Sequence, residues 1–190
     1  MPDARRPPRG TNTRPTRAPD GYRRPGPRAA LPGPRLRADV IDVYVFRTTN
    51  ARRRAPVEFL QLLRATPPLE GTWHPVMGHI EPGETAVDAA RRELREELSL
   101  AAPALVDLFA LEQVHPYYLP ALDAIVCSPR FAARVEPRWQ PRLNAEHSRH
   151  RWVKADTAPA RFMWPGQRAA ITEVLHIARA APDDPRRLPG

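Results

Sequence analysis

Three glutamates, Glu93, Glu96 and Glu97, are the residues whose type and spacing point most directly to chemistry. If they lie on a helix, spacings of three and four residues place their carboxylates on neighbouring positions of one face. Like charges held together in this way repel one another and destabilise a helix that offers them no partner. A divalent cation would turn the repulsion into binding, and ligands that are all oxygen favour a hard ion, Mg²⁺ or Mn²⁺. A solvated face of charged residues is the alternative.

The helix that must position these glutamates is predicted from Thr85 onward. Thr85 can cap its N-terminus, and Asp88, three residues later, completes a capping box. Apolar residues then recur at helical spacing and form one apolar stripe: Val87, Ala90, Leu94 and Leu98. The sequence therefore predicts an amphipathic helix that carries the three carboxylates.

The whole segment 78–100 resembles the box of the Nudix hydrolase family, G-x5-E-x7-R-E-U-x-E-E-x-G-U, in which U is an aliphatic residue. The matching residues are Gly78, Glu84, Arg92, Glu93, Leu94, Glu96, Glu97 and Leu100. Ser99 stands where the family has a second glycine, which ends the helix with a positive φ. A serine in that geometry costs about 1 kcal/mol, and the alternative is a helix that ends differently.

The resemblance implies a fold, a reaction and a set of site residues. The fold is of the α/β class, the Nudix α/β/α sandwich with a mixed sheet between helices, and the reaction is attack of water on a phosphorus of a diphosphate derivative. Glu93 and Glu97 are implied as the principal metal ligands and catalytic residues, and Glu96 as their assistant. The backbone carbonyl of Gly78 is implied to complete the metal site. Two further residues are implied to brace the carboxylates, Glu84 and Arg92.

Glu146 is the notable acid outside the box. It lies in N-A-E-H-S-R-H-R-W-V, a pattern that resembles the segment where several Nudix pyrophosphatases place an extra metal-binding glutamate. A plain loop acid is the alternative, and the general base, which family members take from the box or from a distant loop, stays open. His79 stands at a position of the box that varies in the family, and His147 and His150 are expected to make ordinary polar contacts rather than to ligate a metal.

Two residues are candidates for binding substrate. Arg64 closes a strand predicted at 57–64 and could hold a phosphate, with a solvated strand end as the alternative. Tyr117 lies between His115 and Tyr118, and an exposed aromatic loop of this kind could stack a base. An ordinary loop explains the same residues equally well.

The chain is predicted to contain one folded domain, at residues 36–182. Residues 1–35, rich in Arg and Pro, cannot bury enough apolar surface to offset their ordering entropy, so we expect them to be disordered. Residues 183–190 are expected to form a frayed end. Within the domain we expect a loop over 134–144, a final helix after Trp164, and strands at 40–46, 57–64, 76–80, 104–114, 122–127 and 150–153.

Charge and composition limit the possible partners. The net charge is +9, but residues 1–35 contribute +7 of it, so the basicity belongs to the tail. Weak binding of this tail to RNA or another polyanion is one hypothesis, and a solvated tail without a specific role is the other. No apolar run approaches the roughly 18 residues of a membrane span, so no membrane association is expected. The single cysteine, Cys127, cannot form an internal disulfide, which fits a cytoplasmic location. The oligomeric state stays open.

The predicted function is Mg²⁺-dependent hydrolysis of a nucleoside diphosphate derivative. E-H-x3-R-W at 146–152, followed by W-P-G-Q-R at 164–168, is most similar to the bacterial dihydroneopterin triphosphate and dATP pyrophosphatases. We therefore expect cleavage of a nucleoside or pterin triphosphate to a monophosphate and pyrophosphate. One alternative is a Nudix hydrolase of ADP-ribose, a nucleotide sugar or a dinucleoside polyphosphate. The other is a non-catalytic module that senses nucleotides.

Overall fold

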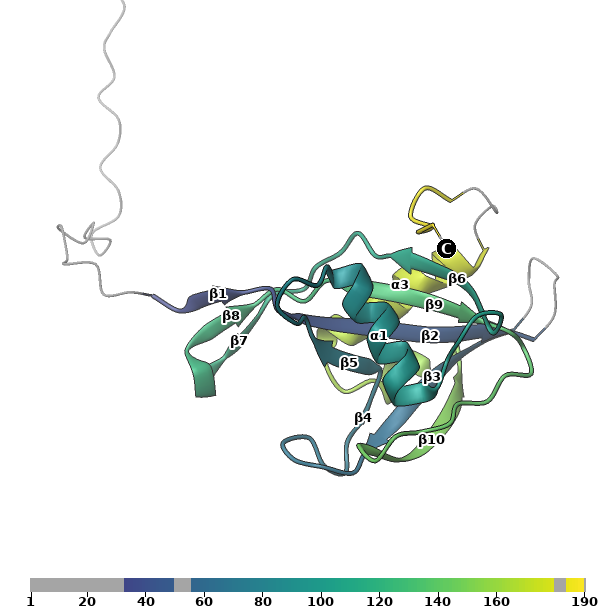
Figure 1. Ribbon diagram of the computed structural model, residues 1–190, viewed down its shortest axis with the longest axis horizontal. Coiled ribbons are helices and arrows are strands. Elements are labelled where there is room, and N and C mark those ends of the chain that lie inside the picture. The colour runs from purple at the N-terminus through teal and green to yellow at the C-terminus, as the bar shows by residue number, and fades with distance from the viewer. Residues whose placement is uncertain (1–32, 50–55, 180–183, 190) are drawn as a thin grey trace, which may run out of the picture. The chain divides into compact units, whose positions relative to one another are not determined.

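A seven-stranded sheet lies at the centre of residues 34–190 (Figure 1). The computed structural model describes residues 33–49, 56–179 and 184–189. The strands of this sheet are β2 Val40–Thr48, β3 Val57–Arg64, β4 Trp73–His74, β5 Val76–His79, β6 Leu105–Ala110, β9 Arg130–Val135 and β10 His147–Lys154. Five of them follow one another in the order β10-β3-β2-β9-β6, while β4 pairs with β3 and β5 pairs with β2.

The sheet is mixed, as the sequence predicted. β2 runs parallel to β9, with Asp42 opposite Arg130, whereas β2 pairs antiparallel with both β3 and β5. The pairs β10–β3, β3–β4 and β6–β9 are also antiparallel. Since β2 has neighbours on both sides, it is buried along most of its length and forms the middle of the core.

Alternation along β2 sends side chains to two separate cores. Ile41, Val43 and Val45 pack with the helix α1, whereas Tyr44 and Phe46 pack with α2 and α3 on the opposite face. Figure 1 shows α1 in front of the sheet and α3 behind it. Helices therefore cover both faces, which confirms the predicted α/β/α sandwich; their bounds are α1 Ala86–Leu98, α2 Ala158–Arg161 and α3 Pro165–Arg179.

None of the helices in the described ranges is both long and apolar enough to cross a membrane.

A second, three-stranded sheet was not predicted. It consists of β1 Arg35–Arg37, β8 Ala124–Val126 and β7 Tyr117–Leu119, in the order β1-β8-β7. The 3₁₀ turn η1, Pro120–Leu122, joins β7 to β8. β8 lies within the single strand predicted at 122–127, and Tyr117, expected in a loop, begins β7.

The predicted loop at 134–144 is wrong at its start, because β9 continues to Val135. Alanines in the middle of β9 and arginines near its ends gave no strand signal in the sequence. The strand forms because β2 and β6 pair with it on either side, and its two arginines form ion pairs with carboxylates. Arg130 lies 3.5 Å from Asp42, and Arg134 lies 3.2 Å from Asp107.

Other predicted strands differ in length. The strand predicted at 104–114 ends at Ala110, and the one predicted at 150–153 extends over the whole of β10. In β10 the sequence Ser-Arg-His-Arg lacks the alternation of apolar and polar residues that predicts a strand. These residues are extended because they pair with β3.

The prediction of a frayed end is wrong for residues 184–189. Leu188 donates its backbone N–H to Leu108 (2.8 Å), and Ala110 donates its own to Arg186 (2.9 Å), so the segment adds to the free side of β6. Its three charged residues help to fix this conformation, because Asp184 pairs with Arg186 and Arg187 pairs with Asp107. At the other end, Arg35 belongs to β1, and the rest of the predicted tail up to residue 32 lies outside the described residues.

Candidate functional site

Helix α1 begins and ends as the sequence indicates. The Thr85 hydroxyl accepts from the Asp88 backbone N–H (3.2 Å), and the Asp88 carboxylate accepts from the Thr85 N–H (3.3 Å), so the capping box is confirmed. At the other end Ser99 adopts the left-handed conformation, with φ 52° and ψ 32°. Its hydroxyl donates to the Arg142 carbonyl (3.2 Å), which offsets part of the steric cost of a serine there.

Glu97 is the most buried acid of the box, with 1% of its surface exposed. Burial raises its pKa to about 9, and the nearby charges of Glu93 and Glu146 act in the same direction. Its Oε2 atom has no hydrogen-bond partner among the described residues. A carboxylate in this environment is stable only with a proton or with a cation beside it.

Glu93 lies directly against the backbone of β5. Burial raises the pKa of Glu93, opposed by the guanidinium of Arg92. A Cβ atom built on Gly78 would lie only 1.9 Å from Glu93 Oε1, so any side chain at that position would displace the Glu93 carboxylate. The structure thus brings the backbone of Gly78 against the acidic face of α1 and gives a reason for its glycine.

Arg92 joins the box residues to one another. Its Nε and one terminal nitrogen donate to both oxygens of Glu84 (2.9 and 3.0 Å), while the other terminal nitrogen donates to Glu93 (2.8 Å) and Glu96 (3.1 Å). It also donates to the His79 carbonyl (2.7 Å), which ties the loop before α1 to the helix. Arg92 and Glu84 thus contact each other beside the helix carboxylates, and their role in bracing a metal site stays a prediction.

Glu146 and Arg64 reach the same cluster from a different part of the chain. Glu146 lies just before β10, and its carboxylate pairs with the guanidinium of Arg64 at the end of β3. The Glu146 charge raises the pKa values of both Glu93 and Glu97, so the three carboxylates act on one another. Arg64 is thus engaged with Glu146 and is not an isolated strand end.

Two histidines lie beside the cluster: His74, which no sequence pattern indicated, and His147, for which only ordinary polar contacts were expected. The two rings lie 5.3 Å apart, and His147 Nε2 is 3.9 Å from Glu97 Oε2. Burial lowers the pKa of His147 to about 4 and also lowers that of His74, so both imidazoles are neutral at pH 7. His74 gave no signal because it stands outside the box, between Trp73 and Pro75, just before the strand predicted at 76–80.

Tyr117 does not join the carboxylates. It lies on β7 of the small sheet, partly exposed, and burial raises its pKa, with Asp42 as the next cause. The remaining charges that affect this pKa belong to Arg130, Arg37 and Asp39, and none of them to α1. No contact in the described ranges links Tyr117 to the glutamate cluster.

The donor atoms of the cluster fit a divalent cation, although they are not yet gathered around one point. In the described part of the chain, no three His, Cys, Asp or Glu side chains converge as a ready-made metal site. Arg92 occupies Glu93 and Arg64 occupies Glu146, so a cation would have to replace these arginine contacts. The unpartnered oxygen of buried Glu97 and the close approach of the Gly78 backbone to Glu93 are the features that favour such a replacement.

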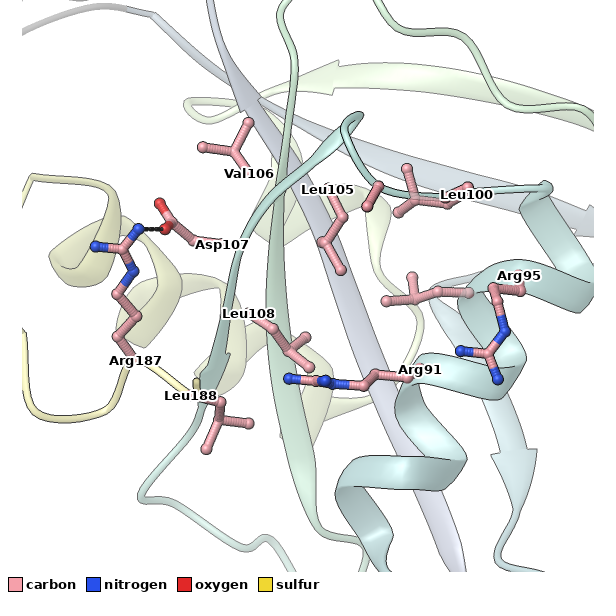
Figure 2. A pocket seen from close by; sticks show the side chains of 12 residues that line it. Arg91, Arg95, Leu100, Leu105, Val106, Asp107, Leu108, Arg187 and Leu188 are labelled. Atoms are coloured by element: carbon pink, nitrogen blue, oxygen red, sulfur yellow. Dashed lines mark ion pairs between the residues drawn. The ribbon is translucent and has the colours of Figure 1, made fainter. Parts of the chain in front are cut away.

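A cavity of about 350 Å³ lies elsewhere, between α1, β6 and the C-terminal segment (Figure 2). Figure 2 shows leucines around it, with Arg91 and Arg95 reaching in from α1 and the Arg187–Asp107 ion pair at its margin. None of its lining residues belongs to the glutamate cluster. The cavity is therefore separate from the candidate active site.

Two known proteins are similar to this chain in sequence. Over 123 residues it is 37% identical to an octanoyltransferase of Myxococcus xanthus, a match that covers 62% of this chain and 32% of that protein. Over 118 residues it is 30% identical to the asymmetrical bis(5'-nucleosyl)-tetraphosphatase of Rattus norvegicus, covering 62% of this chain and 78% of that protein. The chain thus spans about a third of the length of the first relative and most of the second.

Solved structures of other proteins share the fold of this chain. An Ap4A hydrolase of C. elegans, crystallised as a binary complex, superposes with a TM-score of 0.60 at 21% identity, over 74% of this chain and 96% of that one. The dihydroneopterin triphosphate pyrophosphohydrolase of E. coli superposes with a TM-score of 0.57 at 22% identity, over 71% and 94%. At these identities the likeness establishes a shared fold.

The family follows from a match to a family profile. The profile of the NUDIX domain matches residues 38–174, which include the acidic helix, Glu146 and most of α3. Members of this family include hydrolases of phosphoric anhydride bonds, and Nudix hydrolases generally use divalent metal ions. The chain therefore belongs to the NUDIX domain family.

Proposed function

We propose that this protein uses a bound divalent cation to hydrolyse a phosphoric anhydride bond of a nucleoside or pterin polyphosphate. The observation that carries the proposal is the buried carboxylate of Glu97, which has an unpartnered oxygen beside the charges of Glu93 and Glu146. Glu93 and Glu97 are buried, and two such acids beside the charge of Glu146 are costly as bare anions. A cation relieves that cost, and an all-oxygen ligand set favours Mg²⁺ or Mn²⁺.

The residues would divide the work by position. Glu93 and Glu97 would hold the cation, Glu96 and Glu146 would add charge from the solvent side, and the Gly78 carbonyl would complete the ligand set. When bound, the cation supplies a Lewis acid that spreads the charge of a phosphate and lowers the pKa of a water. Arg92 holds Glu96 in place and, together with Glu84, fixes the loop before the helix. This bracing would keep the carboxylates oriented while the substrate is hydrolysed.

Two acids are candidates for the general base. A base that takes a proton from water must be reached by solvent, and Glu96 and Glu146 have side chains 57% and 49% exposed. Glu93 and Glu97 are too buried for that role and are better suited to holding a cation. The two exposed acids can be separated by replacing each with glutamine.

Arg64 is proposed to bind a phosphate. Its guanidinium already lies beside Glu146 at the margin of the cluster and makes a charge-assisted hydrogen bond there. A phosphate oxygen can take the place of the Glu146 carboxylate, since both are anionic acceptors of suitable geometry. That exchange would free Glu146 for the cation at the moment when the substrate arrives.

Two substrate classes have specific support. The order of E-H-x3-R-W and W-P-G-Q-R favours a purine nucleoside or pterin triphosphate, cleaved to a monophosphate and pyrophosphate. The 30% identity to a bis(5'-nucleosyl)-tetraphosphatase favours a dinucleoside tetraphosphate, cleaved asymmetrically. Both carry more negative charge than ADP-ribose, which suits a site with a fourth carboxylate, Glu146, to hold additional cations.

Product analysis by phosphorus NMR tests the proposal. Dihydroneopterin triphosphate, dATP, Ap4A and ADP-ribose are incubated in parallel, with Mg²⁺ and with a chelator. We expect Mg²⁺-dependent release of pyrophosphate from a triphosphate, or of a mononucleotide and a nucleoside triphosphate from Ap4A. Preferential cleavage of ADP-ribose contradicts the substrate assignment, and binding of nucleotides without any turnover would support a sensing module instead.

A matched pair of variants tests the part of Glu146. Glu146→Gln should lower turnover at least tenfold and weaken its dependence on Mg²⁺, because one carboxylate is lost from the cluster. Glu136→Gln, on the exposed turn after β9, is the control and should leave both quantities unchanged. Equal behaviour of the two variants would show that Glu146 is an ordinary loop acid.

A further inference from the structure

Two buried histidines stand behind the glutamate cluster without a full set of partners. His74 on β4 and His147 at the start of β10 come together because β3 pairs with both strands. They are 1% and 4% exposed, and Glu97, which His147 faces, is 1% exposed. Three polar side chains so deeply buried normally satisfy one another or an enclosed ligand.

The tautomer of His74 follows from one short hydrogen bond. Its Nδ1 lies 2.7 Å from the carbonyl oxygen of Pro75, which can only accept. Nδ1 of His74 therefore carries the proton, and Nε2 of the neutral ring presents a lone pair. No donor reaches this Nε2 among the described residues.

The tautomer of His147 follows from Asn144. The backbone N–H of Glu146 donates to Asn144 Oδ1 (3.0 Å), which identifies that atom as the amide oxygen. His147 Nδ1 lies 3.3 Å from the same oxygen and is therefore its donor. Nε2 of His147 is then unprotonated and carries a lone pair. It lies 3.9 Å from Glu97 Oε2, which is too far for a hydrogen bond.

The cluster thus contains three buried polar atoms without a partner among the described residues: His74 Nε2, His147 Nε2 and Glu97 Oε2. Each buried polar atom left without a partner costs on the order of 1–3 kcal/mol. A metal ion satisfies all three at once. Histidines that bind metals usually donate their other ring N–H to a carbonyl or another acceptor, which is the arrangement that Pro75 and Asn144 provide here.

We propose that His74 and His147, together with Glu97, bind a transition-metal dication of the Zn²⁺ or Co²⁺ type. Two imidazoles and one carboxylate favour such a borderline ion over Mg²⁺, which prefers oxygen. The site rests on the proposed function only in sharing Glu97 with the carboxylate cluster. Its occupation would place a second, nitrogen-bound ion behind the cation that the glutamates hold, and would orient Glu97 between the two.

The three side chains must come closer together to bind one ion, since no three such side chains in the described ranges converge on one point. Two ligand atoms on one tetrahedral zinc ion are about 3.3 Å apart, from metal–ligand distances of about 2.0–2.1 Å. His147 Nε2 and Glu97 Oε2, now 3.9 Å apart, must therefore approach each other slightly. Glu97 lies on a side chain with several rotatable bonds, which makes this movement accessible without a change of the backbone.

The test is direct metal binding by the full-length protein without substrate. Metal-free protein is titrated with Co²⁺ in the presence of excess Mg²⁺, and the visible absorption of the ion is recorded. We expect uptake of one Co²⁺ per chain with an intense visible band of low coordination number, displaced by Zn²⁺ and resistant to Mg²⁺. Absence of any saturable uptake overturns the proposal, and a water molecule would then be the partner of the three polar atoms.

Variants assign the ligands. His74→Gln and His147→Gln should each weaken Co²⁺ binding at least tenfold, whereas His176→Gln, on the exposed side of α3, should not alter it. Unchanged binding in both buried-site variants would refute the assignment. Because a buried substitution can disturb folding, nitrogen-15 NMR of the histidines in the unaltered protein gives a second measurement. Zn²⁺ should shift two Nε2 resonances and leave both Nδ1 atoms protonated, and any other pattern contradicts the site.

Failure of this proposal is distinguishable from failure of the proposed function. Hydrolysis of a polyphosphate with Mg²⁺ alone tests the function, whereas Co²⁺ uptake without substrate tests the histidine site. A protein that hydrolyses its substrate but takes up no Co²⁺ refutes only the second. A protein that binds Co²⁺ through the histidines but turns over no substrate refutes only the first.

Discussion

Replacing Glu97 by glutamine should stabilise the metal-free protein and abolish most of its activity. Glutamine keeps the shape of the side chain and can still accept from the Met77 backbone, as Glu97 does. It removes the charge whose burial raises the pKa of Glu97 to about 9. Its amide N–H can also donate toward the Nε2 lone pair of His147, 3.9 Å from the present Oε2.

The magnitude follows from the two pKa values. The model-compound pKa of Glu is 4.5 and the folded value is about 9, so the folded state binds the proton more tightly than the unfolded state. The contribution to stability is therefore fully present below pH 4.5 and is lost as the pH rises towards 9. At about 1.4 kcal/mol per pKa unit, the wild type should lose about 3 kcal/mol of unfolding free energy between pH 4.5 and pH 7 from this group.

Urea denaturation of metal-free protein between pH 4.5 and 9 measures this effect. The difference between wild type and Glu97→Gln cancels the opposite contributions of His74 and His147, whose pKa values are lowered. The difference should grow in favour of the variant with rising pH. With Mg²⁺ present, the wild type should recover stability and the variant should not, while turnover of the variant falls a hundredfold or more.

Two results would refute this reasoning. A difference in unfolding free energy that does not change with pH means that Glu97 is not a buried acid with a raised pKa. Near-normal Mg²⁺-dependent turnover in the variant means that Glu97 does not hold the cation. Glu136→Gln serves as the control for both measurements and should match the wild type.

Three further predictions concern the box and the tail. Ser99→Gly should raise the unfolding free energy by a few tenths of a kcal/mol, because relief of the strained left-handed backbone is partly offset by loss of the hydroxyl hydrogen bond to Arg142. Ser99→Ala should lower the unfolding free energy. The reverse order of the two variants in urea denaturation would contradict the left-handed cap. Gly78→Ala should lower kcat at least tenfold, because its Cβ displaces Glu93, and normal kcat would show that Glu93 can move without consequence. Deletion of residues 2–32 should leave Tm and kcat unchanged and weaken any binding to RNA; a large fall in Tm would reveal a stabilising contact.

The part of the site that lies on one helix was predictable from the sequence alone. Capping by Thr85, the apolar stripe and the spacing of the glutamates all depend on residues fewer than five positions apart, so local rules are enough. Glu146 was found only through a resemblance, since nothing local shows that it meets α1. Its approach depends on how β10 pairs with β3, which is a long-range property of the sheet.

Elements that depend on distant partners were the ones missed. β9 has alanines and arginines where a strand normally shows β-branched residues, and it forms because two neighbours pair with it. His74 and His147 are far apart in the sequence and meet only through β3. No spacing rule connects them, so the site they form is recognisable only from the arrangement in space.

The contact of residues 184–189 with β6 has a practical consequence for handling the protein. β6 is the last strand of its sheet, and an uncovered strand of this kind is a template for pairing with other molecules. The backbone hydrogen bonds of Leu108 and Ala110 with this segment occupy groups of β6 that could otherwise pair with another molecule. An affinity tag or a truncation that loosens the segment would therefore promote self-association in concentrated solution, so a purification tag belongs at the N-terminus.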